Sequence, residues 1–156
     1  MISACSLGTI KPAVAAQTTG TLPIASSILL SRAVTASEDA GFFGHRGFDF
    51  REIASAVAER SRVRGASTIT QQVSKNLFLS PERTLARKVR EALGTVALES
   101  SLQKSRILEI YLNLAEWGPG VYGVGEAARF WFGKDARDLT AREAASWPAN
   151  ASKNRT

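Results

Sequence analysis

Two neighbouring segments of the chain carry the side chains best suited to chemistry. The first, residues 36–47, holds the adjacent acids Glu38 and Asp39, two phenylalanines and the only histidine, His45. The second, residues 64–77, is crowded with hydroxyl and amide side chains and contains a lysine. Acids, amides and a cation in such close succession are typical neither of a core nor of a plain surface, so the two segments predict a polar cleft.

The acidic pair has an ordinary interpretation and a catalytic one. Adjacent acids at the end of a helix are usually solvated or capping residues. Here the apolar residues Val34, Phe42 and Phe43 flank Glu38. Apolar flanks desolvate a carboxyl group, as a general acid or base near neutral pH requires. We expect His45 to act mainly through an orienting hydrogen bond rather than through direct chemistry.

The ordinary interpretation of the second segment is a capped amphipathic helix, with Ser67 or Thr68 as its N-cap. That interpretation does not explain two adjacent glutamines followed by Lys75 and Asn76. Amides and hydroxyls at helical spacing suit a polyhydroxyl or N-acetyl sugar, and a lysine one turn further suits a phosphate. The binding candidates of this segment are Ser67, Thr68, Gln71, Gln72, Lys75 and Asn76.

A third motif places Arg83, Arg87 and Glu91 at a spacing of four, which puts them on one stripe of a helix. A salt-bridged, exposed helix face is the common explanation of such a pattern. The functional alternative is a cationic strip that holds a pyrophosphate, with Glu91 as a second acid among the cations.

Composition limits the chain to one domain and excludes several kinds of site. With 156 residues, 44% of them hydrophobic, the chain is long enough for one packed core. The single cysteine and single histidine exclude an internal disulfide, a cysteine-based metal site and a multi-histidine zinc site. A metal would therefore be a hard cation on oxygen ligands. The net charge of +6 favours an anionic partner such as a phospholipid, a phosphorylated substrate or nucleic acid.

Apolar periodicity predicts a mainly α fold with few or no strands. Helices are expected over residues 28–38, 50–60, 67–79, 81–102, 104–114 and 126–131. The helix over residues 81–102 has an apolar face made of Leu85, Val89, Ala92, Leu93 and Val96. Thr140 and Glu143 form a capping box that opens the last helix. The glycine-rich residues 118–123 predict a turn, and core packing is the default expectation for Trp117.

The ends of the chain differ in composition from its middle. We expect residues 1–24 to form a flexible leader, residues 25–156 to form the domain and residues 149–156 to fray. The longest apolar stretch, residues 22–30, is interrupted by polar residues and is far too short to span a membrane.

Taken in order, the motifs resemble the peptidoglycan glycosyltransferase domain, glycosyltransferase family 51. The family's pattern is Glu-Asp-x-x-Phe-x-x-His-x-Gly, then Gly-x-Ser-Thr-Ile-x-Gln-Gln-x-x-Lys-Asn, Arg-Lys-x-x-Glu and Ile-Leu-Glu-x-Tyr-Leu-Asn. The chain matches these four motifs at residues 38–47, 65–76, 87–91 and 107–113. Residues 116–118, Glu-Trp-Gly, resemble the monofunctional branch of that family, which lacks a transpeptidase domain.

The resemblance implies a lysozyme-like fold and a glycosyltransferase that polymerises lipid II, an undecaprenyl-pyrophosphoryl disaccharide-pentapeptide, into glycan strands. By match to the motifs, Glu38 is implied as the general base for the acceptor sugar's 4-hydroxyl and Glu91 as a second essential acid. Lys75 and Arg83 are implied to hold the donor pyrophosphate, with a divalent metal such as Mg²⁺ and no organic cofactor. The implied substrate-binding residues are Asp39, Ser67, Thr68, Gln71, Gln72, Lys75, Asn76, Arg83 and Arg87.

The resemblance also sets expectations about partners and location. The implied partners are lipid II, the growing glycan strand, a membrane surface and other cell-wall synthesis proteins, at the periplasmic face of the bacterial inner membrane. Nucleic acid is not expected, because the basic residues are interspersed with catalytic-type acids. The chain departs from the family's pattern in having no transmembrane helix. It departs again after residues 143–145, so we expect its C-terminal helices to be shortened.

Two other functions stay open on the sequence alone. One is a lysozyme-like hydrolase of finished glycan, although cleavage does not need Lys75 and Arg83. The other is a truncated remnant that binds lipid II or membrane without turnover.

Overall fold

A computed structural model describes residues 28–58, 67–78 and 84–153, and every structural statement below concerns these residues. Their elements are α2 (Ile28–Glu38), α3 (Phe50–Ala58), α4 (Ile69–Phe78), α5 (Leu85–Ser101), α6 (Lys104–Leu114), β1 (Glu116–Gly118), β2 (Val121–Tyr122), α7 (Val124–Phe132), the 3₁₀ turn η2 (Ala136–Asp138) and α8 (Ala141–Lys153). The prediction of a mainly α, lysozyme-like fold with few strands is confirmed. The predicted leader, residues 1–24, lies outside the described residues.

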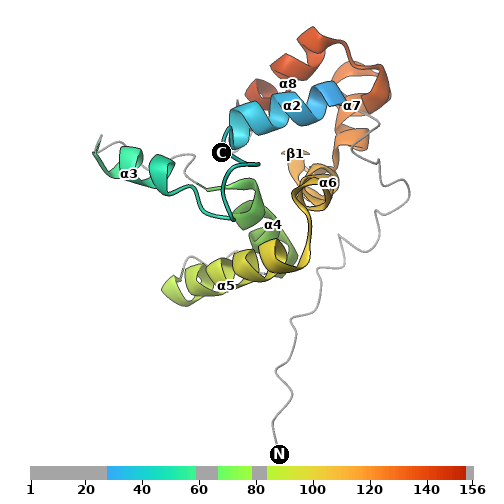
Figure 1. Ribbon diagram of the computed structural model, residues 1–156. Helices are drawn as coiled ribbons and strands as arrows, with labels where there is room; N and C mark the ends of the chain where they lie inside the picture. Colours follow the sequence, from blue (N-terminus) through green and yellow to red (C-terminus); the bar gives the residue numbers. More distant parts are fainter. Residues whose placement is uncertain (1–27, 59–66, 79–83, 154–156) are drawn as a thin grey trace, which may run out of the picture.

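The described helices other than α3 pack around one core (Figure 1). α2 packs against α8, while α4 packs against both α5 and α6. The core joins Leu30 of α2, Ile69 of α4, Leu98 of α5 and Ile107 of α6 in a single buried cluster. α3 projects away from this assembly in Figure 1. The C-terminal end of α2 and the N-terminal end of α4 are thereby fixed next to each other, which matters for the site.

A small hairpin follows α6 where the sequence predicted only a turn. β1 and β2 pair antiparallel, with Glu116 opposite Tyr122. Gly123 closes the hairpin with a φ of +76°, and a Cβ there would lie 2.8 Å from the carbonyl oxygen of Asn113, so the position requires glycine. Trp117 is buried in the core, as expected, and makes an edge contact with Trp147.

α5 begins later than predicted. Thr84 has an extended backbone, with φ −109° and ψ 153°, and its hydroxyl accepts a hydrogen bond from the Arg87 N–H. A side chain that caps in this way marks the N-terminal start of a helix. α5 therefore starts at Leu85 and not at residue 81. Arg83 lies outside the described residues.

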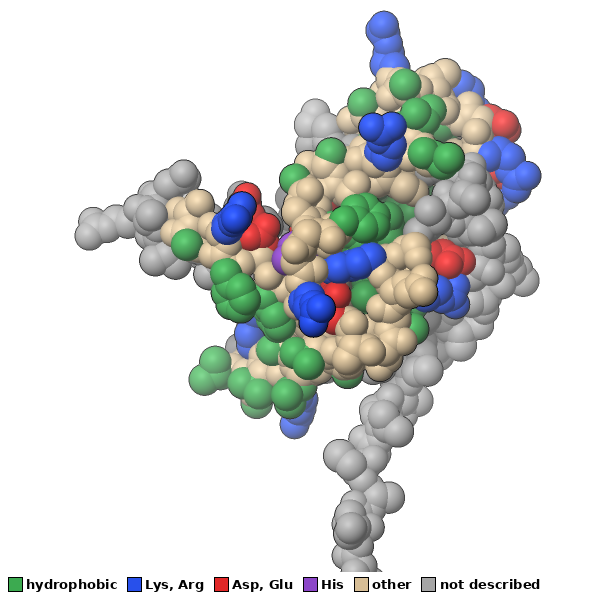
Figure 2. Space-filling model, viewed as in Figure 1, with side chains coloured by type: hydrophobic (Ala, Val, Ile, Leu, Met, Phe, Trp, Pro, Cys, Tyr) green, Lys and Arg blue, Asp and Glu red, His purple; other side chains and the backbone are tan. Residues whose placement is uncertain are grey.

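The apolar face predicted for α5 exists, but most of it points to solvent. The exposed fractions are 82% for Leu85, 54% for Val89, 66% for Leu93 and 56% for Val96. The face buried against α4 is instead the one that carries Glu91, Thr95 and Leu98. The Ser74 and Thr95 hydroxyls donate to the carbonyl oxygen of Glu91, so a polar seam joins the two helices. Figure 2 shows hydrophobic side chains gathered at the lower left, over this part of the molecule.

Other boundaries differ by smaller amounts. α2 and α6 have the predicted bounds, and Leu29 and Ala36 of α2 are exposed. α7 begins at Val124, two residues before the predicted start. α8 continues to Lys153. The expectation that the chain frays from residue 149 onward is therefore wrong for residues 149–153. α3 ends at Ala58, and the residues that follow lie outside the described ranges.

The capping box predicted for the last helix is confirmed. The Thr140 hydroxyl accepts from the Glu143 N–H, and Glu143 Oε2 accepts from the Thr140 N–H at 2.8 Å. Lys134 Nζ donates to the other Glu143 oxygen at 2.8 Å. The hydrogen bonds from Lys134, first, and from Thr140 lower the pKa of Glu143 from 4.5 to about 2.

This lowered pKa predicts an acid-sensitive contribution to stability. Because the pKa is lower in the folded chain than in the unfolded one, the contribution is complete above pH about 4.5 and is lost as the pH falls toward 2. The midpoint of thermal unfolding should therefore fall less between pH 6 and pH 3 in Glu143→Gln than in the parent. Equal falls in the two proteins would contradict this origin of the acid sensitivity.

Candidate active site

The acidic pair lies on the wall of an open cleft. Glu38 is the last residue of α2 and Asp39 follows it directly. The cleft has a volume of about 200 Å³. It is lined by Ala36, Ser37, Glu38, Asp39, Ala40, Asp49, Glu52, Ser67 and Thr68. The structure therefore brings the start of the first segment, residues 36–40, and the start of the second, Ser67 and Thr68, to one cavity, as the sequence predicted.

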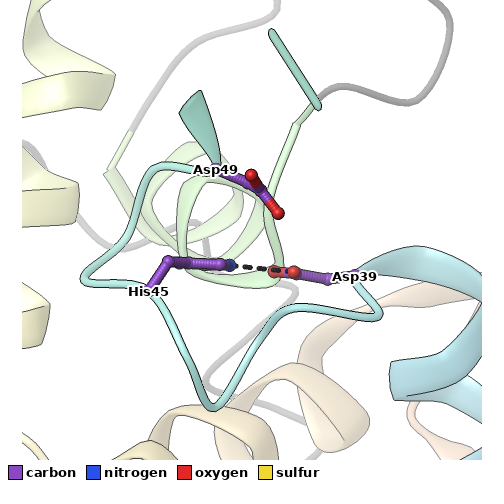
Figure 3. A group of neighbouring side chains, drawn as sticks. All are labelled: Asp39, His45 and Asp49. Carbon is purple, nitrogen blue, oxygen red and sulfur yellow. Dashed lines mark hydrogen bonds and ion pairs between the residues drawn. The ribbon is translucent and has the colours of Figure 1, made fainter. Parts of the chain in front are cut away.

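Asp39 joins the two segments through hydrogen bonds that its carboxylate accepts from the start of α4 and from His45. One carboxylate oxygen accepts the Ile69 N–H at 3.0 Å, and the other accepts from His45 Nε2 at 2.8 Å (Figure 3). Ile69 is the first residue of α4, where an anion is favoured by the unpaired N–H groups and the helix dipole. The Gly47 N–H donates to His45 Nδ1 at 3.1 Å, so Nε2 is the ring nitrogen that carries the proton. The orienting role expected of His45 is confirmed.

A second capping box starts α4. The Thr68 hydroxyl accepts from the Gln71 N–H at 3.3 Å, while Gln71 Oε1 accepts from the Thr68 N–H at 3.0 Å. The Thr68 hydroxyl also donates to the Gly47 carbonyl oxygen at 2.7 Å. Thr68 and Gln71 are both buried, so the structure gives them roles in holding the helix start, and their contact with substrate stays a prediction.

Gln72 connects the cleft to the core. Its Nε2 donates to Glu38 Oε2 at 3.2 Å, and its Oε1 accepts from the Tyr111 hydroxyl at 3.3 Å. A carboxylate that is held by an amide donor on one side and faces an open cavity on the other is placed to take a proton from a bound hydroxyl.

Glu91 forms the predicted stripe with Arg87, but not as an exposed face. Its side chain is almost completely buried, and Arg87 Nη1 lies 2.8 Å from Glu91 Oε2. Lys88 pairs with the other carboxylate oxygen. The interpretation of this motif as a solvated salt bridge is therefore wrong for Glu91, because a buried acid here holds two cations in place.

The remaining binding candidates of the second segment are Lys75, Asn76 and Ser67, and none of them is buried. Lys75 is exposed in the last turn of α4, Asn76 is half-buried, and Ser67 is exposed at the cleft. Lys75 is not among the residues that line the cavity around Glu38. Its assignment to the pyrophosphate, like that of Arg83, stays a prediction.

The chain matches the family model described as Transglycosylase over residues 13–153. It belongs to this family. It is 50% identical over 129 residues to a protein of Nitrosomonas eutropha named biosynthetic peptidoglycan transglycosylase, covering 80% of this chain and 52% of that protein. Proteins with the same name from Azoarcus and Nitrobacter winogradskyi are 50% and 52% identical, covering 76% and 74% of the chain and 53% of each relative. The chain thus spans about half the length of the curated relatives it matches.

Sequence reasoning missed several residues of this candidate site. Asp49 and Glu52 line the cleft beside Glu38. Asp49 also caps α3, because its Oδ1 accepts from the Arg51 and Glu52 N–H groups at 2.9 and 3.2 Å. An aspartate directly before a predicted helix was a usable signal for that cap. Nothing in the sequence pattern signalled the contact between Tyr111 and Gln72.

A metal does not fit the acidic and histidine groups that come closest to one another. Asp39, His45 and Asp49 can bring ligand atoms within 4.8 Å of one another (Figure 3). Both oxygens of Asp39 already accept N–H donors, and His45 directs a proton at one of them. A cation on His45 Nε2 would need that proton moved to Nδ1, where the Gly47 N–H already points. Within the described residues, this group serves the fold of the transglycosylase domain rather than a metal.

Proposed function

We propose that this transglycosylase polymerises lipid II into glycan strands by a single inverting displacement, with undecaprenyl pyrophosphate as the leaving group. The observation that carries the proposal is the Glu38 carboxylate, held by Gln72 on the wall of an open polar cleft. It is supported by family membership and by relatives named biosynthetic peptidoglycan transglycosylases.

In this mechanism Glu38 is the general base. It takes the proton from the acceptor sugar's 4-hydroxyl while that oxygen attacks the donor's anomeric carbon. Asp39 does not compete for this role, since both of its oxygens are used to hold the start of α4 and His45. Glu38 is therefore the acid of the pair that is left to face the substrate.

The leaving pyrophosphate needs cations rather than a general acid. Lys75, Arg83 and Arg87 are proposed to supply them. Glu91 keeps Arg87 and Lys88 in fixed positions. Mg²⁺ stays a proposal that rests on the chemistry of the pyrophosphate, whose oxygens are ligands that it prefers.

A membrane surface is the proposed site of action, at the outer face of the bacterial inner membrane. None of the helices in the described part of the chain is long and apolar enough to cross a bilayer. The proposed contact with the membrane is the exposed apolar face of α5, made of Leu85, Val89, Leu93 and Val96. The net charge of +6 favours an anionic lipid surface.

Vesicle binding tests this contact. Leu93→Glu should weaken binding to anionic phospholipid vesicles by about tenfold or more, because burying a leucine is worth about 1.5–3 kcal/mol. Phe130→Glu is the matched control, since Phe130 is 61% exposed on α7 and Leu93 is 66% exposed on α5. Equal losses in co-sedimentation for the two variants would show that α5 is not the contact face.

The activity itself is tested with purified protein, labelled lipid II, detergent and Mg²⁺. The proposal expects glycan polymer and release of undecaprenyl pyrophosphate in equal measure with the bonds formed. Binding of lipid II without polymer would favour a remnant without turnover. Release of sugar from finished peptidoglycan would favour a hydrolase.

A further inference from the structure

Tyr111 is a tyrosine in a position that packing alone would give to phenylalanine. It lies on α6 with 1% of its surface exposed, inside the main apolar cluster and edge-on to the Trp117 ring at 5.8 Å. A hydroxyl in such a place costs free energy unless it finds a partner. The Tyr111 hydroxyl donates to Gln72 Oε1 at 3.3 Å, which ties this core residue to the side chain that holds Glu38.

The Gln72 amide can satisfy its neighbours in only one of its two orientations. Its Nε2 donates to Glu38 Oε2 at 3.2 Å and lies 3.4 Å from the Ser67 carbonyl oxygen. An ionised carboxylate only accepts, so it needs the Nε2 end, and a hydroxyl that donates needs the Oε1 end. Both neighbours therefore select the same orientation, and a rotation by half a turn would turn Oε1 toward the carboxylate.

We propose that Tyr111 is a positioning residue for Glu38 and acts through the Gln72 amide. Its hydroxyl fixes the orientation of the amide, and the amide in turn fixes the carboxylate. The catalytic consequence rests on the proposed function, but the orientation itself does not. Without the hydroxyl, Oε1 loses a donor, the turned amide becomes accessible, and Glu38 spends part of its time without its amide donor.

Kinetics of lipid II polymerisation test the consequence. Tyr111→Phe keeps the ring and should lower kcat about 2–10-fold, the loss expected for one neutral hydrogen bond, with little change in KM. Tyr122→Phe is the matched control, because it removes a phenolic hydroxyl from the hairpin and should leave kcat at the parent's value. In the Gln72→Ala background, adding Tyr111→Phe should lower kcat no further. A double variant whose loss is the product of the two single losses would overturn the route through Gln72.

The side-chain amide signals of Gln72 test the orientation without any activity. They are identified in the ¹H–¹⁵N spectrum as the pair that disappears in Gln72→Ala. The pair should move in Tyr111→Phe and in Glu38→Gln and stay in place in Tyr122→Phe. An unmoved pair in Tyr111→Phe would overturn the proposal. If the parent makes no polymer, the proposed function fails while this spectrum still decides whether Tyr111 orients Gln72.

Discussion

Glu38→Gln is expected to lower the rate of glycan polymerisation by about 10²–10⁴-fold, the range typical of a lost general base. Glutamine has almost the same shape as glutamate, but it cannot accept the acceptor sugar's proton. Its amide oxygen can still accept from Gln72 Nε2, which donates to Glu38 in the parent. The fold should therefore be kept, and lipid II binding should stay close to that of the parent.

Glu52→Gln is the matched control for this variant. Glu52 lines the same cleft and its removal changes the charge of the cavity by the same amount. It is exposed at the start of α3 rather than held against α4. Most of the polymerisation rate should survive in Glu52→Gln. Equal losses in the two variants would mean that the charge of the cleft matters and that proton transfer to Glu38 does not.

Gly47→Ala is expected to lower the free energy of unfolding by about 2–5 kcal/mol. Gly47 has a φ of +86°, and a Cβ there would lie 2.7 Å from Thr95 Cγ2. A left-handed backbone costs an L-residue about 1–2 kcal/mol, and overpacking costs about 1–3 kcal/mol more. The backbone of Gly47 also contacts the His45 ring and the Thr68 hydroxyl, so a shift would loosen the cleft. Urea unfolding measures the loss.

Gly120→Ala separates strain from packing. Gly120 has a similar φ of +74°, but a Cβ there would meet nothing within 4 Å. The free energy of unfolding should therefore fall only by the cost of the left-handed backbone, about 1–2 kcal/mol. If both variants lost the same free energy, contact with α5 would not be the reason that position 47 is glycine.

Local signals in the sequence predicted the local parts of the structure. The bounds of α2 and α6 followed from apolar periodicity, and the start of α8 followed from the Thr140–Glu143 capping box. The candidate site also followed from motif chemistry, since Glu38, Asp39, Ser67 and Thr68 do line one cleft. Each of these features depends on residues close in the chain or on motifs recognised as a block.

Features that depend on tertiary packing were not predictable. Periodicity found the apolar stripe of α5 but could not tell whether protein or solvent covers it. The hydrogen bond that the Ile69 N–H donates to Asp39 joins residues 30 apart in the chain. The hydrogen bond that the Tyr111 hydroxyl donates to Gln72 joins residues 39 apart. Such contacts arise only once α2, α4 and α6 are packed, and no local pattern encodes them.

The most direct test of Glu38 as the base of a lipid II polymerase is one time course with labelled lipid II. Parent and Glu38→Gln are followed in the same detergent and Mg²⁺, with the product resolved by length. The parent should form polymer with inverted configuration at each new bond, while Glu38→Gln should bind lipid II and form almost none. Polymer formed by Glu38→Gln at the parent's rate would contradict the account.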